Sequence, residues 1–224
     1  MWGFKYSPGS IEGANFTAAW DVTTGSASQS IGIVDSGIAR NHDELAQQLR
    51  VHSSFPFGGH DFISDASSSG DGDGRDNDPM DTSSFCGHGT HVAGIIAAST
   101  NNGSGMAGVA PNARIVPVRA LGRCGGTSED VADSIRWAAG VSVAGVPVNQ
   151  NPAKVLNLSL GGTGPCNANM QSAVDSALAR GAVVVVAAGN DAVLASGFSP
   201  ANCKGVVAVA ASNRSEERRV GKEC

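Results

Sequence analysis

The sequence has few aromatic residues, few charges and no long apolar run. Aromatics make up 5% and charged residues 16% of the 224 residues. No stretch of 18 apolar residues occurs, so we expect no membrane-spanning helix. The net charge is −5, and no block of lysine or arginine lies outside the last few residues. A nucleic-acid or other polyanion partner is therefore not expected.

The remaining composition is that of a globular protein. Hydrophobic residues make up 41% of the chain, and 224 residues can bury one sizeable core. The 30 glycines follow no fixed period, which excludes a collagen-like chain and indicates many tight turns. The first residues, MWGFKYSPG, lack the basic and apolar regions of a signal peptide. We expect either a cytosolic protein or a leader that lies outside this sequence.

The segment from Arg214 to Cys224 differs from everything before it. It reads RSEERRVGKEC, a charged string without an apolar period, and it matches the translation of a common sequencing adapter letter for letter. We interpret 214–224 as an adapter artefact and assign the domain to 1–213. A natural charged tail is the alternative, and resequencing of the source DNA across Asn213 distinguishes the two.

The other cysteines point to an oxidising compartment. They number four and show no CxxC spacing, which argues against zinc and favours disulfides: Cys86, Cys124, Cys166 and Cys203. Three pairings are open, and four buried free thiols are the alternative.

Short apolar runs alternate with helical stretches, the pattern of an α/β protein with a mostly parallel sheet. The runs are near-continuous rather than alternating, so both faces of the sheet should be covered. The predicted strands are Ser30 to Asp35, Arg114 to Arg119, Lys154 to Leu158, Ala182 to Ala187 and Val206 to Ala211. The predicted helices are His88 to Ser99, Ser128 to Val143 and Asn169 to Arg180.

Two polar features accompany these elements. Ser128, followed by Glu129 and Asp130, is predicted to cap the second helix at its amino end. Between Phe57 and Cys86 the chain is polar and matches no regular element. A loop of that length inside a domain is usually functional or ordered by a metal ion.

Three segments carry residues suited to catalysis, each at a strand end or helix start. In IGIVDSGI, Asp35 ends a strand; in CGHGTHVAGIIAAS, His88 opens a helix between two glycines; in VVVVAAGND, Asn190 follows a buried strand. Taken alone, an aspartate after a strand is more often a turn residue. His88 and His91 stand one turn apart, but neither an HExxH pattern nor a cysteine partner supports zinc there.

In the order Asp, His, Asn, these segments resemble the subtilisin-like serine proteases. That family has aspartate in DSG, histidine in HGTHVAG, asparagine in AAGN and serine in GTSMAxP. The resemblance covers about residues 2 to 213 and is nearest to secreted Gram-negative members. It implies an α/β, three-layer subtilisin-like fold with a mostly parallel central sheet, and a secreted serine endopeptidase.

The family pattern implies a role for each matching residue. Asp35 would orient His88, His88 would act as general base, and Asn190 would donate to the oxyanion, while His91 would be structural. The implied substrate-binding residues are Leu121, Gly122, Gly125, Gly126, Ser159, Leu160, Gly161, Ala187, Ala188 and Gly189. In such a fold we favour the disulfides Cys86–Cys124 and Cys166–Cys203, because each would join loops at the same end of neighbouring strands.

The nucleophile of the family pattern is missing, since GTSMAxP does not occur. Ser128 follows Gly126 and Thr127, but two carboxylates come next, so a helix cap is its expected role. We therefore expect 1–213 to be the amino-terminal two-thirds of a catalytic domain, without turnover. A calcium-bound pseudoprotease that binds peptides without cutting them is the alternative. A dinucleotide-binding domain would need GxGxxG after the first strand, which is absent.

Calcium is the cofactor that the resemblance implies. The loop DGDGRDNDPMD offers hard oxygen ligands at Asp71, Asp73, Asp76 and Asp78. It lacks the distal glutamate of an EF-hand, and a merely solvated acidic loop is the alternative. Glu44 and Asn102 form a weaker second candidate site. The partners implied are protein or peptide substrates and the protein's own propeptide, with a monomeric enzyme.

Overall fold

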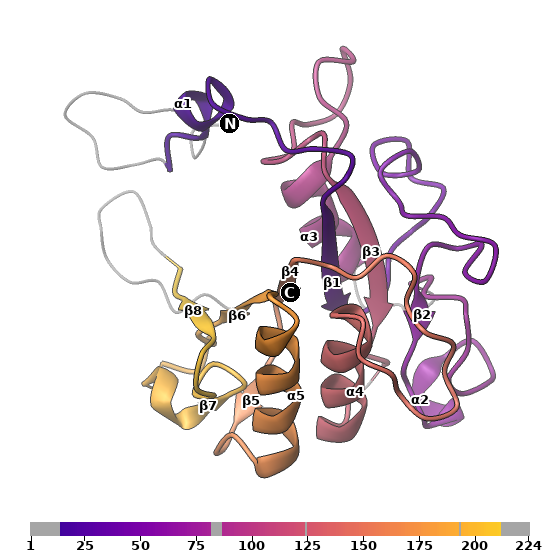
Figure 1. The fold of residues 1–224 in the computed structure, drawn as a ribbon, viewed down its shortest axis with the longest axis vertical. Helices are drawn as coiled ribbons and strands as arrows, with labels where there is room; N and C mark the ends of the chain where they lie inside the picture. Colours follow the sequence, from indigo (N-terminus) through magenta and orange to yellow (C-terminus); the bar gives the residue numbers. More distant parts are fainter. Residues whose placement is uncertain (1–13, 82–86, 124, 193, 212–224) are drawn as a thin grey trace.

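Six strands form one parallel sheet in the computed structural model, which describes residues 14–81, 87–123, 125–192 and 194–211 (Figure 1). In spatial order they are β2 (His60–Asp61), β3 (Arg114–Arg119), β1 (Ser30–Asp35), β4 (Val155–Leu158), β6 (Val183–Ala187) and β8 (Val207–Val209). Each neighbouring pair runs parallel. The predicted α/β fold with a mostly parallel sheet is confirmed.

Helices lie on both faces of this sheet. α3 (His88–Ala97) packs against β1 and β3 on one face, and α4 (Ser128–Ala138) lies beside α5 (Ala168–Ala179) on the other. The smaller elements are α1 (Phe16–Trp20), α2 (Ala66–Ser69), the 3₁₀ helix η2 (Ala195–Gly197), and the antiparallel strands β5 (Gly162–Thr163) and β7 (Phe198–Ser199). Within the described ranges, no helix is long and apolar enough to cross a membrane.

Strand alternation divides the core into two clusters. Ile33 and Ile115 pack with α3, whereas Val34 and Val116 belong to the larger cluster beneath α4 and α5. Gly32 faces that larger cluster, and a Cβ there would lie 2.8 Å from Leu156 Cδ2. The strand needs glycine at this position because its neighbour packs directly against the backbone.

The predicted element boundaries are nearly right. β1 and β3 match, β4 and β6 each start one residue later than predicted, and β8 is shorter. The first two predicted helices extend too far: α3 ends at Ala97 and α4 at Ala138. Gly140 has a φ of 81° and lies against Pro152, so the chain turns away soon after α4.

The predicted cap of α4 is wrong by one residue. Thr127, not Ser128, is the N-cap, and its Oγ1 accepts a hydrogen bond of 3.0 Å from the Asp130 amide. Ser128 is the first helical residue, and its hydroxyl accepts from Asn167 Nδ2 at 2.8 Å. The Gly126–Ser128 segment therefore begins a helix, in agreement with the capping role expected of this segment.

The polar stretch after Phe57 is less irregular than predicted. It contains β2, which pairs with β3, and the short helix α2, whose N-cap Asp65 accepts from the Ser67 amide. Two-residue strands leave no periodic signal, so the sequence could not show this.

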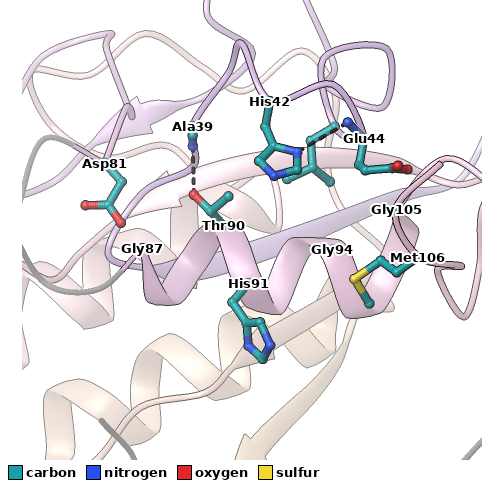
Figure 2. Close-up of a pocket in the computed structure, with 11 residues that line it drawn as sticks. Ala39, His42, Glu44, Asp81, Gly87, Thr90, His91, Gly94, Gly105 and Met106 are labelled. Atoms are coloured by element: carbon teal, nitrogen blue, oxygen red, sulfur yellow. Dashed lines mark hydrogen bonds between the residues drawn. The ribbon is translucent and has the colours of Figure 1, made fainter. Parts of the chain in front are cut away.

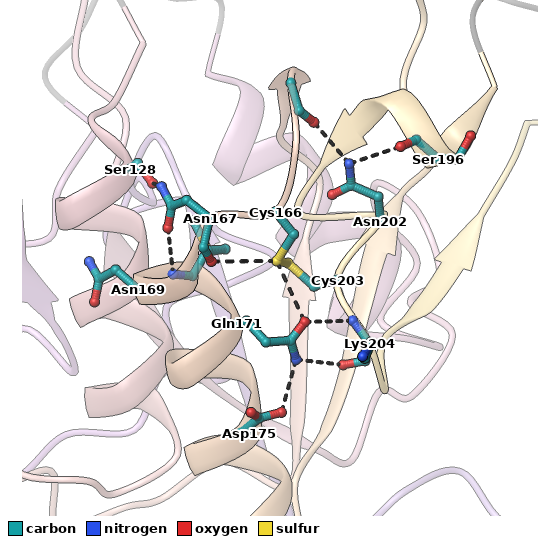
Figure 3. Close-up of a disulfide and its surroundings, with 12 residues drawn as sticks. Ser128, Cys166, Asn167, Asn169, Gln171, Asp175, Ser196, Asn202, Cys203 and Lys204 are labelled. Carbon is teal, nitrogen blue, oxygen red and sulfur yellow. Dashed lines mark hydrogen bonds between the residues drawn. A yellow bond between two sulfur atoms is a disulfide. The ribbon is translucent and has the colours of Figure 1, made fainter.

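One of the two favoured disulfides is confirmed. Cys166, before α5, is bonded to Cys203, before β8, with a Cα–Cα distance of 5.2 Å (Figure 3). Cys86 and Cys124 lie outside the described residues, so their pairing stays a prediction. The observed bond joins the segments that carry β5 and β7, and it thereby supports the small second sheet.

Among the described residues, no helix covers the α3 face of the sheet over β4, β6 and β8. Leu156 and Val184 are fully buried on the opposite face, whereas Val183 is 47% and Val207 49% exposed. Val155 and Val209 are also exposed. An apolar surface is thus exposed around Val207 and Val209, and it extends across three strands. We call Val155, Val183, Val207 and Val209 the valine face.

His60 is a buried histidine without a hydrogen-bond partner on either ring nitrogen. Its ring centroid lies 4.9 Å from that of Phe62, 5.8 Å from Trp137 and 6.1 Å from Phe55. Burial, and secondarily the nearby charge of Arg75, lowers the pKa of His60 to about 4. The folded state therefore holds a neutral imidazole in an aromatic cage.

This histidine should weaken the fold in acid. As the pH falls below 6.5, His60 becomes protonated in the unfolded chain. In the folded chain it stays neutral until the pH reaches about 4, so protonation favours the unfolded state. His60→Phe removes this difference, so relative to the original chain it should gain about 2 kcal/mol of unfolding free energy between pH 7.5 and 4.5. Urea unfolding at several pH values measures it, with the exposed His42→Phe as control. Parallel curves for His60→Phe and the original chain would contradict the interpretation.

Comparison with the original chain is needed because Asp61 acts in the opposite direction. Burial raises the pKa of Asp61 to about 7 despite hydrogen bonds from Ile63 and Arg119. The folded state therefore binds this proton first, and Asp61 contributes stability at low pH that is lost as the pH rises through 7.

The valine face should cause self-association of the 224-residue chain. Val183→Thr combined with Val207→Thr keeps β-branched side chains but adds two hydroxyls, so it should lower light scattering and binding of a hydrophobic dye. Val51→Thr is the control, since Val51 is 65% exposed but lies outside the sheet. Equal effects of the double variant and the control would show that the valine face does not drive association.

Candidate active site

Asp35 and His88 meet where β1 ends and α3 begins. The Asp35 Oδ1 atom lies 2.7 Å from His88 Nδ1. Asp35 is fully buried, while the His88 side chain keeps 24% of its surface exposed. An ionised carboxylate only accepts hydrogen bonds, so His88 Nδ1 carries the proton of this contact. The predicted pair is brought together by the fold.

Ser36, which the sequence analysis did not single out, fixes this contact. Its amide donates to Asp35 Oδ1 at 2.7 Å, and its hydroxyl accepts from the Gly89 amide at 3.1 Å while donating to Asp81 Oδ2 at 2.9 Å. The strand end and the first turn of α3 are thereby joined through one side chain. Ser36 is the serine of the DSG motif, so the motif itself could have pointed to this residue.

Gly89 allows the helix to approach the strand. A Cβ at this position would overlap the Gly37 carbonyl oxygen and lie 3.2 Å from Asp35 Cβ. Only glycine leaves room for the backbone that follows β1, so the glycine after His88 is a condition for the Asp35–His88 distance.

Asn190 lies in the loop that follows β6. β1 pairs with β4 and β4 with β6, all parallel, so the strand ends at Asp35 and Ala187 belong to the same edge of the sheet. Asn190 comes three residues after Ala187 and is partly buried. The fold thus puts this residue at the edge that carries Asp35, and its oxyanion role stays a prediction.

Half of the predicted substrate-binding residues line one cavity of about 660 Å³: Leu121, Gly125, Gly126, Leu160 and Gly161. Sequence analysis missed several other lining residues, among them Val131 on α4, Met170 on α5 and Pro200 after β7. The remaining five lie elsewhere along the same segments: Gly122, Ser159, Ala187, Ala188 and Gly189. Gly122 forms a bridge with Gly125, and the Ala188 amide donates to the Val209 carbonyl at 2.8 Å.

A second cavity, of about 570 Å³, lies beside α3 (Figure 2). His91, Thr90 and Gly94 line it from the helix, and His42 and Glu44 line it from the segment after β1. The Thr90 hydroxyl accepts from the Ala39 amide at 2.9 Å, which ties that segment to the helix. His91 is exposed at this cavity, and its predicted structural role stays untested.

Two arginines hold the acidic loop. Arg119, fully buried at the end of β3, donates to Asp61, to Asp71 and to the Ser69 carbonyl. Arg75 reaches α4 instead, with distances of 2.6 Å to Asp130 and 2.9 Å to Asp133. Part of the negative charge of this region is thus balanced by guanidinium groups of the chain.

The four predicted calcium ligands influence one another electrostatically, but the structure does not arrange them as a metal site. Burial raises the pKa of Asp76, and the charges of Asp73, Asp78 and Asp71 raise it further. Burial acts to raise the pKa of Asp71 as well, but hydrogen bonds from Ser69 and Arg119 outweigh it and leave that pKa lowered. Among the residues that the structure describes, no group of three or more His, Cys, Asp or Glu side chains is arranged to hold a metal ion.

Glu44, the weaker candidate from the sequence, fits a cation better. It is 6% exposed, and its Oε2 atom is buried without a hydrogen-bond partner. Its other oxygen lies against Gly105, where a Cβ would overlap it, and Figure 2 shows both residues at one end of the cavity. The loop that includes Asn102 and Gly105 thus meets the Glu44 carboxylate, whose Oε2 atom is buried and lacks a donor.

Comparison with known proteins agrees with this geometry. The Subtilase family (peptidase S8) matches residues 26–221. That range extends into the segment after Arg214, so it does not test the adapter interpretation.

Two curated relatives are named as proteases. The chain is 48% identical to the "Extracellular protease" of Xanthomonas campestris, covering 89% of this chain, and 40% identical to the "Extracellular basic protease" of Dichelobacter nodosus, covering 92%. It spans 36% of the length of each relative.

A solved protease from Pseudoalteromonas arctica superposes with a TM-score of 0.86 at 44% identity. The match covers 97% of this chain and 65% of that one. Sequence motifs, the Asp35–His88 contact and the sheet order agree with these similarities, and the chain belongs to the subtilase family of serine proteases.

Proposed function

We propose that the full-length protein is a serine endopeptidase that hydrolyses peptide bonds, with this chain supplying all of its catalytic groups except the nucleophile. The observation that carries the proposal is the 2.7 Å contact between buried Asp35 and half-buried His88. A buried carboxylate that fixes one ring nitrogen prepares the other nitrogen to act as general base.

In this mechanism the second nitrogen of His88 takes the proton of a serine hydroxyl as the oxygen attacks the peptide carbonyl. Asp35 stabilises the imidazolium that forms and does not take the proton itself. The Asn190 amide donates to the oxyanion of the tetrahedral intermediate. His88 then returns the proton to the leaving amine, and water releases the acyl group by the same steps.

The serine is proposed to come from a segment outside these 224 residues. GTSMAxP does not occur in the chain, and the GTS at Gly126 is used to begin α4. The valine face lies on the same side of the sheet as α3 and offers an apolar surface for such a segment. We accordingly propose that this chain alone has no peptidase turnover, and that 1–213 are part of a catalytic domain.

We further propose secretion, substrates that are proteins or peptides, a propeptide in the precursor and a monomeric enzyme. Both curated relatives carry the word "extracellular" in their names, and the Cys166–Cys203 disulfide suits an oxidising compartment.

Histidine replacement tests the assignment in the full-length enzyme. His88→Ala should abolish hydrolysis of casein and of chromogenic peptides, because no base is left to activate the nucleophile. His91→Ala is the matched control one turn along α3, and it should retain kcat. Full-length protein that binds peptides but never cleaves them would instead support a pseudoprotease.

The role of Asn190 has its own test. Asn190→Ala should lower kcat by roughly 10²–10³-fold with little change in KM, since the lost donor acts in the transition state. This range is the one known for an oxyanion donor of subtilisin, which belongs to the same family. Asn41→Ala, at an exposed position, is the control. An unchanged kcat for Asn190→Ala would remove Asn190 from the mechanism.

Calcium is proposed at Glu44 with Asn102, where it would neutralise the buried carboxylate and join the two loops. The acidic loop, Asp71 to Asp78, is the second proposed site, although Asp71 is already bound to Arg119. In this role calcium is structural and takes no part in the chemical step.

Calcium should raise the melting temperature of the full-length protein relative to EDTA, because binding stabilises only the folded state, by about 2.7 kcal/mol at 100 times Kd. Glu44→Gln should lose most of this shift, whereas Asp43→Asn, at the exposed neighbour, should keep it. If Asp76→Asn removes the shift and Glu44→Gln does not, the acidic loop is the principal site.

A further inference from the structure

The loop between α3 and β3 contains a chemically reactive pair of residues. Asn102 is followed by Gly103, and every other asparagine of the sequence is followed by a residue that has a Cβ. The backbone nitrogen of the following residue can attack the carbonyl carbon of an asparagine side chain. Glycine permits this attack best, because it has no Cβ to obstruct the approach and its backbone is the least restricted.

The structure leaves this pair open to solvent. Residues 101–105 are all exposed. Gly103 has a φ of 77°, and apart from its chain neighbours no atom lies within 4 Å of the position that a Cβ on it would take. Among the residues that the structure describes, the Gly103 amide donates no hydrogen bond to a backbone carbonyl. Its nitrogen is therefore not held in secondary structure.

The Asn102 side chain is already folded over its own backbone. Its Oδ1 atom accepts a hydrogen bond of 3.1 Å from the Ser104 amide. The ring that this bond closes contains the Gly103 nitrogen, so the side-chain carbonyl is turned towards the atom that would attack it. The same hydrogen bond draws electrons towards Oδ1 and makes the carbonyl carbon, Cγ, more electrophilic.

From this arrangement we infer that Asn102 is a site of spontaneous deamidation, with water as the only co-reactant. The Gly103 nitrogen forms a bond to Asn102 Cγ and loses its proton. The bond between Cγ and Nδ2 breaks, and ammonia leaves with that proton. Water then opens the five-membered succinimide at either of its two carbonyls, which gives aspartate or isoaspartate.

Either product changes the loop that contacts Glu44. The base of this loop is closed by a hydrogen bond of 3.2 Å from the Gly108 amide to the Ala98 carbonyl. Gly105 lies directly against Glu44, whose Oε2 atom is buried and lacks a donor (Figure 2). Both products add a negative charge to the segment that leads to Gly105, and isoaspartate also adds one carbon atom to the backbone. We therefore expect the modified protein to melt at a lower temperature in EDTA.

Peptide mapping of aged protein tests the inference. Full-length protein is incubated in mildly alkaline buffer with EDTA, and a serine-directed phosphonate prevents self-digestion. Fragmentation mass spectrometry should then find a gain of one mass unit at Asn102, as both aspartate and isoaspartate. Conversion of Asn102 should exceed that of Asn41 and Asn112 by at least about tenfold, because these two exposed asparagines precede residues that have a Cβ.

Asn102→Gln is the matched variant. Its side chain has the same amide group but is one carbon longer, so the attack would have to close a six-membered ring, which forms more slowly. The melting temperature of the original protein should fall during ageing, whereas that of Asn102→Gln should stay constant. Each protein is compared with its own fresh sample, so any effect of the substitution on calcium binding cancels.

Several results would contradict the inference. An unmodified Asn102 in the aged original protein would overturn it, and so would equal conversion of Asn41 and Asn112. Aspartate without isoaspartate would show direct hydrolysis by water and exclude the succinimide. Conversion without a change in melting temperature would remove the effect on the Glu44 contact. No readout here depends on peptide hydrolysis, so failure of the proposed peptidase function would leave this inference intact.

Discussion

Burial of the Asp35 carboxylate at the end of β1 is the constraint on which the site depends. Removed from water, this group needs donors, and its Oδ1 atom obtains two, from the Ser36 amide and from His88, whereas Oδ2 is buried without one. The donor on His88 must come from the first turn of α3, so that helix has to start within hydrogen-bond reach of the strand. Gly89 makes the approach sterically feasible, and Ser36 secures it with a second hydrogen bond. Local chemistry at one strand end therefore sets the position of a helix.

The same edge of the sheet carries other buried ionisable groups. Asp61, Arg119 and Asp35 end three neighbouring strands, and the register pairs Arg119 with each of the two aspartates. The bonds from Arg119 to Asp61 and Asp71 tie the acidic loop to this edge. An arginine suits that position, because its planar group has five donors and can satisfy several acceptors at once. The same guanidinium binds Asp71, one of the calcium ligands that the sequence suggested, and its role as a ligand stays a prediction.

Prediction from sequence succeeded where a signal was either long or highly specific. The strands at Ser30 to Asp35 and Arg114 to Arg119 were indicated by continuous apolar runs, and the Asp35–His88 pair by its motifs. Prediction from sequence failed where the outcome depended on backbone angles or on contacts between residues distant in the chain. The N-cap of α4 is Thr127 and not Ser128. Both residues carry a hydroxyl, so the sequence could not show which of them has the extended backbone of a cap. β2, β5 and β7 are too short for any period, and the packing of Phe198 against Gly161 and Gly189 joins positions that are distant in sequence.

Stability and catalysis are connected through one face of the sheet. The register places Ile31 of β1 in a row with Val155 and Val183, and Asp35, four residues after Ile31, projects to the same side. α3 covers this side over β1 and β3, while the valine face remains open beside it. A segment that buried the valines would therefore lie next to His88, where the proposed mechanism needs its nucleophile. Apolar burial of about 25 cal/mol per Å² would drive that docking, so the surface predicted to cause self-association is also the surface on which the proposed active site would be completed.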